Sequence, residues 1–159
     1  MNTDEIIKIL EDNKLIRDTS MNTVALMEYQ ENYPLLSIKC EEIDDLLGGG
    51  LKPECVYEVY GAFGSGKTQF CLALTAEAIY QKKSVVWVDC EDTFRPRRVF
   101  EILREREYAK DDKEAEKYLD RIKYFFTPNT EQLMGTINAL SDVILECNPR
   151  VVIIDGSIG

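Results

Sequence analysis

Residues 61–68 constrain the fold of this chain most strongly, because they match the phosphate-binding pattern G-x-x-x-x-G-K-[ST] at every position. In order they are Gly61, Ala62, Phe63, Gly64, Ser65, Gly66, Lys67 and Thr68. The three glycines allow backbone N–H groups to turn inward around a phosphate. Such a loop functions between a strand and the N-terminus of a helix, so the sequence must supply both.

Both flanks are present in the sequence. Residues 55–60 (CVYEVY) are typical of a strand, and residues 67–80 predict a helix with Phe70, Leu74 and Ile79 on its inner side. We therefore expect the loop to bind a nucleoside triphosphate. Lys67 would contact the β- and γ-phosphates, and the Thr68 hydroxyl would be a ligand of Mg²⁺.

Strands and helices are predicted to alternate along the rest of the chain. The apolar runs at 84–89, 122–126 and 151–155 predict buried strands. A charge-dense stretch at 95–117 predicts one or two helices, and Thr130 is predicted to cap a helix that ends at Asn148-Pro149. This alternation is typical of an α/β fold with a mostly parallel sheet and flanking helices, of the P-loop NTPase class.

The beginning of the chain has a different character. Residues 1–33 predict a short helical segment or linker, with one helix after Thr3-Asp4 and a second from Thr19-Ser20 to about Tyr29. Asn32-Tyr33-Pro34 interrupts the helical pattern, so the main domain is expected to occupy residues 34–159. A short helix at 41–47 precedes three consecutive glycines, which are expected to end it.

Composition excludes several classes of protein. The chain contains no histidine, so Ser–His and Cys–His mechanisms are excluded and a general base must be a carboxylate or a lysine. Its five cysteines occur singly, which argues against a disulfide framework and a zinc site and favours small buried residues. No apolar run approaches the ~20 residues of a membrane span, and no signal peptide is recognisable, so a cytoplasmic location is expected.

Carboxylates follow two of the predicted strands. Asp155 ends the aliphatic run at 151–154, where it could hold Mg²⁺ beside Thr68. Asp89, Glu91 and Asp92 lie at or just after the end of the 84–89 run, and a carboxylate there could activate the attacking water. Spacing alone does not choose among these three.

Three segments give the chain a recognisable resemblance: EIDDLLGGG at 42–50, FGSGKTQ at 63–69 and VDCEDTFRP at 88–96. Over residues 36–98 the chain resembles the RecA-fold DNA strand-exchange recombinases of the archaeal RadA and eukaryotic recombinase branch. The resemblance implies ATP as the nucleotide and Glu91 as the catalytic glutamate. It also implies that Gln69 belongs to the nucleotide-binding motif and that Arg98 lies over the adenine ring.

The resemblance implies a DNA-dependent ATPase of homologous recombination and DNA repair. Its partners would be single-stranded DNA and further copies of itself in a filament, in a nucleoid or nucleus, with no membrane. The net charge of −10 argues against DNA binding by these residues themselves. The family's DNA-binding loops follow the strand that ends at Asp155, so we expect the chain to be part of a longer or split protein.

The sequence departs from the family pattern at several positions. Arg97 stands where a glutamate is usual, and Gly156 stands where a serine is usual. The N-terminal DNA-binding domain of the family has no counterpart in residues 1–33. Two alternatives therefore remain: a non-catalytic recombinase paralogue that regulates filament assembly, and a related ATPase of the KaiC or RadB type.

Overall fold

The computed structural model describes residues 23–31 and 34–156. The chain divides into two units, one ending at Pro34 and one beginning at Leu35, and each is described by itself. In the first unit, helix α2 spans Thr23–Glu31. It overlaps the second helix predicted there, which was expected to end at about Tyr29. The helix predicted after Thr3-Asp4 lies outside the described residues.

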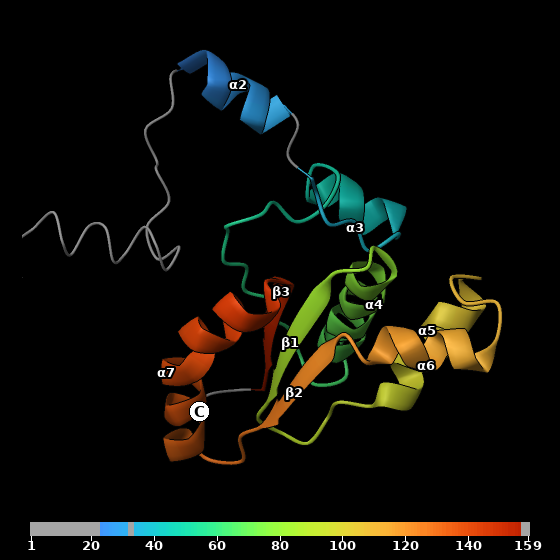
Figure 1. The fold of residues 1–159 in the computed structure, drawn as a ribbon, viewed down its shortest axis with the longest axis vertical. Coiled ribbons are helices and arrows are strands. Elements are labelled where there is room, and N and C mark those ends of the chain that lie inside the picture. Colours follow the sequence, from blue (N-terminus) through green and yellow to red (C-terminus); the bar gives the residue numbers. More distant parts are fainter. Residues whose placement is uncertain (1–22, 32–33, 157–159) are drawn as a thin grey trace, which may run out of the picture. The chain divides into compact units, whose positions relative to one another are not determined.

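A parallel sheet of three strands forms the centre of the second unit (Figure 1). Strand β1 (Ser84–Asp89) lies between β2 (Ile122–Phe126) and β3 (Pro149–Asp155). Both neighbours pair with β1 in parallel. The three apolar runs at 84–89, 122–126 and 151–155 are thus confirmed as strands of one parallel sheet, and the α/β fold class with them.

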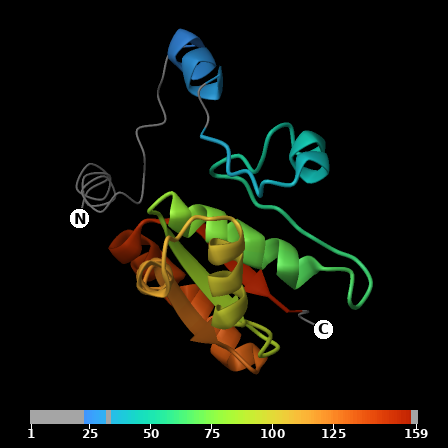
Figure 2. The ribbon, with the colours of Figure 1, turned by 90° about the vertical axis from the view of Figure 1, so that its right-hand side faces the viewer.

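Helices cover both faces of the sheet (Figures 1 and 2). The helices of this unit are α3 (Glu41–Leu46), α4 (Lys67–Tyr80), α5 (Pro96–Glu105), α6 (Asp112–Leu119) and α7 (Thr130–Cys147). Val85 and Trp87 pack in the core with α4, α5 and α6, whereas Val86 and Val88 pack with Leu133 of α7. Successive residues of a strand point to opposite faces, so residues 85–88 of β1 are all apolar because both faces of the strand are buried.

Capping residues explain where several helices begin and end. The predicted N-cap of α7, Thr130, is wrong by one position: Asn129 takes this role, and its side chain accepts a hydrogen bond of 2.9 Å from the Gln132 N–H. The helix ends at Asn148, whose φ of 41° is left-handed. In the same way Asp111 caps α6 by accepting from the Glu114 N–H at 2.9 Å.

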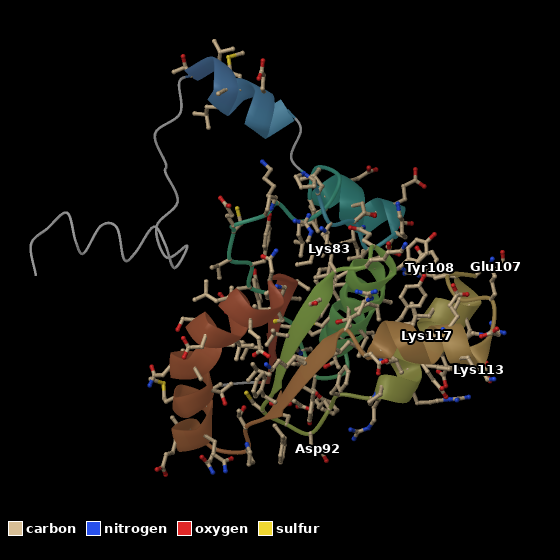
Figure 3. The ribbon with its side chains drawn as sticks, viewed as in Figure 1. Lys83, Asp92, Glu107, Tyr108, Lys113 and Lys117 are labelled. Atoms are coloured by element: carbon tan, nitrogen blue, oxygen red, sulfur yellow. The ribbon has the colours of Figure 1, made fainter. Side chains whose placement is uncertain are left out.

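The core between the sheet and α4–α6 contains the single tryptophan and a buried ion pair. Trp87 is fully buried, with its ring centroid 4.7 Å from that of Phe94. Glu77 of α4 is 1% exposed and accepts hydrogen bonds from Arg106 at 2.6 Å and from the Tyr108 hydroxyl. Tyr108 also stacks on Tyr80 at the C-terminal end of α4, with ring centroids 3.8 Å apart (Figure 3). These contacts fix the α5–α6 connection to α4.

Residues 55–60 do not form the predicted strand. They have no regular secondary structure, and Val56 and Tyr60 are almost wholly exposed. Their composition suits a strand, but a strand also needs a neighbour to pair with, and in the described part of the chain none of β1, β2 and β3 pairs with them. Cys55 is exposed for the same reason, contrary to the prediction of small buried residues, and the other four cysteines are only partly buried.

Among the residues that the structure describes, no helix is both long enough and apolar enough to cross a membrane.

Candidate functional site

The phosphate-binding pattern forms a turn that leads directly into α4. Gly64 and Gly66 have φ values of 76° and 97°, which residues with a side chain rarely adopt. Gly66 is the N-cap of α4, and its carbonyl accepts the Phe70 N–H at 2.9 Å. A Cβ at Gly61 would lie 2.8 Å from the Ser65 Oγ, so the Ser65 side chain would have to rotate to admit one. The backbone conformation of the loop therefore favours glycine most strongly at Gly64 and Gly66.

The Lys67 side chain folds back over this loop. Its ammonium donates to the carbonyl oxygens of Gly61 at 3.0 Å and Ala62 at 3.1 Å. The cation is thereby held beside the first residues of the loop, at the end of α4 where the helix dipole is positive. A positive side chain, exposed loop residues and a helix N-terminus are the features that bind the phosphates of a nucleotide.

Asp155 ends β3 and faces the first turns of α4. It pairs in register with Asp89, the last residue of β1. Burial raises the pKa of the Cys71 thiol to about 12, and the negative charge of Asp155 adds to this effect. Because Cys71 lies about one helical turn after Thr68, the Asp155 carboxylate lies on the side of the sheet where α4 begins. The structure thus brings Asp155 to the end of α4 that carries Thr68.

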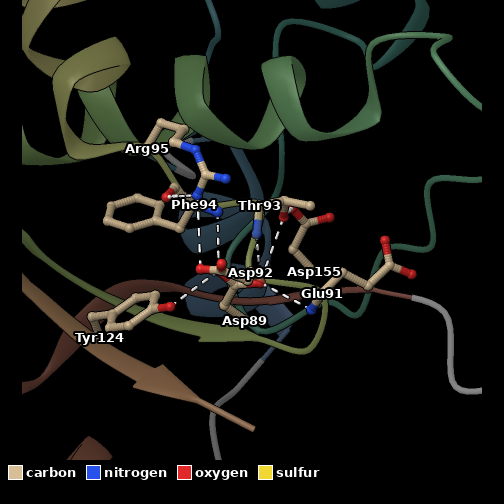
Figure 4. Close-up of polar contacts among 8 residues, drawn as sticks. All are labelled: Asp89, Glu91, Asp92, Thr93, Phe94, Arg95, Tyr124 and Asp155. Carbon is tan, nitrogen blue, oxygen red and sulfur yellow. Dashed lines mark hydrogen bonds and ion pairs between the residues drawn. The ribbon is translucent and has the colours of Figure 1, made fainter. Parts of the chain in front are cut away.

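Glu91 lies at the same edge of the sheet, in the loop after β1. It is exposed, and a Cβ on Gly156 would lie 3.2 Å from its Cγ, so Glu91 is adjacent to the residue that follows Asp155. In Figure 4 its side chain extends away from the Asp89 carboxylate. The carboxyl ends of β1 and β3 therefore place the two predicted acids next to each other.

The other two acids of this loop are already engaged in the described contacts. Asp92 is exposed and forms an ion pair of 3.8 Å with Arg95. Asp89 is fully buried and accepts backbone N–H groups of Glu91 (3.1 Å), Thr93 (3.1 Å) and Phe94 (2.9 Å). Spacing left three candidates open, and the role of Glu91 as the group that activates a reacting water stays a prediction.

Hydrogen bonding keeps Asp89 ionised despite its burial. Desolvation raises the pKa of this carboxyl, but donors from Phe94, Thr93, Glu91 and the Tyr124 hydroxyl outweigh it and lower the pKa below the usual range. Burial and the neighbouring Asp89 charge raise the pKa of Tyr124 in return, so its hydroxyl remains a proton donor.

Arg98 of α5 lies next to the start of α4 but is bound by acidic side chains. Its Nε donates to Gln69 Oε1 at 3.3 Å, and its Nη1 donates to Glu101 at 3.0 Å and Glu105 at 3.2 Å. These two acids raise the pKa of Arg98. The structure therefore brings Gln69 and Arg98 together beside the phosphate loop, and the stacking of Arg98 on adenine stays a prediction.

The oxygen ligands available at this edge suit Mg²⁺. Thr68 would provide a hydroxyl and Asp155 a carboxylate, and magnesium in nucleotide sites takes one or two carboxylates with phosphate oxygens and waters completing its shell. Within residues 23–31 and 34–156 no group of three or more metal-ligating side chains occurs, which such a site does not need. The residues present fit this ion, and their roles as ligands stay predictions.

Sequence reasoning missed Thr93, and it named Asp89 only as one of three candidates for activating water. Thr93 donates from its hydroxyl to Asp155 Oδ2 at 2.9 Å, and Asp89 accepts from the loop that carries Glu91 (Figure 4). The available signal was an Asp followed by a short polar loop, a sequence in which aspartate often accepts nearby N–H groups. Nothing in the sequence indicated the contact between Thr93 and Asp155, which lie 62 residues apart.

Comparison with known proteins identifies relatives of this chain. The chain is 34% identical over 128 residues to the DNA repair and recombination protein RadA of Haloquadratum walsbyi. The matched region covers 77% of this chain and 35% of that protein. It is 28% identical over 155 residues to the DNA repair protein Rad51 homolog of Drosophila melanogaster, covering 94% of this chain and 45% of that protein. A RadA protein of Cenarchaeum symbiosum is 29% identical over 136 residues.

The chain spans between a third and a half of the length of these relatives. The Rad51 family model matches residues 31–159, which include the phosphate loop, all three strands and the acids at their ends. Because the family model matches most of the chain, and because the relatives are similar to it in sequence, the chain belongs to the Rad51 family.

Proposed function

We propose that this chain is the ATP-binding part of a DNA-dependent ATPase that acts in homologous recombination and DNA repair. The observation that carries the proposal is the meeting of three elements at one edge of the sheet: the phosphate loop that begins α4, Asp155 at the end of β3 and Glu91 after β1. The names of the relatives, which describe DNA repair and recombination, support the biological setting.

Each residue has a distinct part in the proposed reaction. The loop N–H groups and the Lys67 ammonium bind the phosphates of ATP, and Lys67 stabilises the charge that grows on them. Glu91 orients the attacking water and accepts its proton. Magnesium, held by Thr68 and Asp155, would neutralise negative charge on the phosphate oxygens when bound. Arg98, beside Gln69, would contact the base through the face of its guanidinium.

Partners follow from the same proposal. Single-stranded DNA is proposed as the activator, and copies of the protein are proposed to assemble on it as a filament. The net charge of −10 disfavours DNA binding by these residues, so we do not propose that DNA binds to them directly. The protein would act wherever its DNA lies, in a nucleoid or in a nucleus.

Two substitutions test the proposal. Lys67→Ala should weaken ATP binding at least tenfold, since it removes the cation that neutralises the phosphates. Glu91→Gln should keep the affinity for ATP and abolish DNA-stimulated hydrolysis. Binding is measured by titration with a fluorescent ATP analogue. Hydrolysis is measured by phosphate release with and without single-stranded DNA, in the longer or split protein to which these residues are proposed to belong, because they are not proposed to bind DNA themselves.

The outcomes distinguish the remaining alternatives. Unchanged affinity in Lys67→Ala would show that the loop does not bind the nucleotide. ATP binding without hydrolysis in the wild-type protein, with or without DNA, would favour a non-catalytic paralogue that regulates filament assembly. Hydrolysis that DNA does not stimulate would favour a related ATPase of the KaiC or RadB type. Lys113→Ala, at an exposed lysine of α6, is the matched control for loss of one lysine.

A further inference from the structure

The carboxylate of Asp89 organises the loop that carries Glu91. Asp89 is the last residue of β1 and is fully buried. Its two oxygens accept the N–H groups of Glu91, Thr93 and Phe94 at 2.9–3.1 Å and the Tyr124 hydroxyl at 3.1 Å (Figure 4). A carboxylate offers about four lone-pair sites, so these four donors fill its capacity. One side chain therefore fixes the backbone on both sides of Asp92.

The same loop also fixes the carboxylate of Asp155. Thr93, whose N–H is held by Asp89, donates its hydroxyl to Asp155 Oδ2 at 2.9 Å. The hydroxyl lies farther from Asp89 Oδ1, at 3.5 Å, so Asp155 is its better acceptor. Thr93 thus links the buried aspartate of β1 to the aspartate that ends β3.

Backbone contacts support this link. The Cys90 N–H donates to the Asp155 carbonyl at 2.8 Å, and Gly156 leaves no space for a Cβ, which would lie 2.6 Å from the Cys90 Cβ. The loop and the end of β3 are therefore in direct contact. A change in the loop would move both Glu91 and Asp155, since no flexible side chain separates the two segments.

We propose that Asp89 and Thr93 are positioning residues for ATP hydrolysis: Asp89 holds the loop that carries Glu91, and Thr93 orients the Asp155 carboxylate toward its metal. This inference rests on the proposed function. In this proposal Asp89 and Thr93 hold Glu91 and Asp155 in place and do not themselves act on ATP or the reacting water. Placement within about 0.5 Å is what such acids require, and supporting hydrogen bonds provide it.

The central test uses Thr93→Val and Thr93→Ser. Valine keeps the shape of threonine and loses the hydroxyl, whereas serine keeps the hydroxyl. Thr93→Val should lower kcat roughly tenfold or more, the effect of losing a hydrogen bond to a charged group, with KM for ATP within about twofold. It should also raise the Mg²⁺ concentration needed for tight ATP binding. Thr93→Ser should restore both values to within about twofold of wild type.

A matched control separates positioning from stability. Thr75→Val removes a fully buried hydroxyl in α4 that donates to the Cys71 carbonyl at 2.9 Å, away from the loop after β1. It should change stability but leave kcat and the Mg²⁺ dependence unchanged. If Thr93→Val affects neither quantity, or if Thr93→Ser is as impaired as Thr93→Val, the role of Thr93 as a positioning residue is wrong.

Asp89 is tested without nucleotide. In Asp89→Asn the amide has one acceptor oxygen in place of two, so the N–H groups of Glu91, Thr93 and Phe94 cannot all remain bonded. Their hydrogen exchange should become at least tenfold faster, while exchange in β2 stays unchanged. Unchanged exchange in the loop would overturn the role of Asp89. A wild-type protein that binds no ATP would overturn the proposed function as well, whereas an active wild type with an unaffected Thr93→Val overturns this inference alone.

Discussion

The buried ion pair between α4 and the α5–α6 connection leads to a quantitative prediction. Glu77 is 1% exposed, and the side chain of its partner Arg106 is 26% exposed, with 2.6 Å between the charged atoms. Removing one partner of a buried pair destabilises a protein by about 3–5 kcal/mol. Because Arg106 keeps some contact with water, we expect Glu77→Gln to lie near the lower end, at about 3 kcal/mol.

For a domain of this size, 1 kcal/mol corresponds to roughly 2–4 °C in Tm, so Glu77→Gln should lower Tm by about 6–12 °C. Urea denaturation followed by circular dichroism measures the loss of unfolding free energy directly. Glu116→Gln, at an exposed position of α6, is the control and should change stability by less than about 0.5 kcal/mol. A loss below about 1 kcal/mol in Glu77→Gln would refute the reasoning, since it would mean that water already screens the pair.

Three further predictions concern single groups. Gly156→Ala places a Cβ 2.6 Å from that of Cys90, at a φ of 134°, so it should destabilise the fold by about 3 kcal/mol, measured by urea denaturation. The control Gly135→Ala lies in open space on α7 and should stabilise the fold by up to about 1 kcal/mol. Equal effects of the two substitutions would contradict the argument. Burial and Glu77 raise the pKa of Tyr108 to about 12, above the ordinary value near 10. The stability that Tyr108 contributes is therefore complete below about pH 10 and lost as the pH rises toward 12. Absorbance titration of tyrosinate should show a late group that is absent in Tyr108→Phe. Finally, a thiol reagent at pH 8 should modify exposed Cys55 quickly and Cys71 hardly at all, because the pKa of Cys71 is about 12; similar rates by mass spectrometry would contradict its burial.

Periodicity in the sequence was sufficient to predict most of the elements that form the site. The helix predicted at 67–80 is α4 at the same bounds, and β1 occupies the predicted 84–89. These elements are long or continuously apolar, so local pattern and burial agree. The positions of Lys67, Thr68 and Asp155 follow from them, since each lies at the end of a predicted element.

Features that depend on contacts between distant residues could not be predicted in this way. Residues 55–60 have the composition of a strand, but pairing is decided by neighbours that the local pattern does not specify. The role of Asp89 could not be predicted, because its four donors come partly from residues that follow it and partly from Tyr124 on β2. The cap at Asn129 differs from the predicted Thr130 because both residue types cap helices well.

Trp87 gives this protein an internal spectroscopic reporter. It is the single tryptophan of the chain, it is fully buried in the central strand, and its ring contacts Phe94. The Phe94 N–H is bonded to Asp89, which also accepts the Glu91 N–H. Because Phe94 itself belongs to that loop, the indole contacts the loop directly, and intrinsic fluorescence excited at the indole band comes from one known position. A shift of its emission on addition of nucleotide would report rearrangement of that loop without any label.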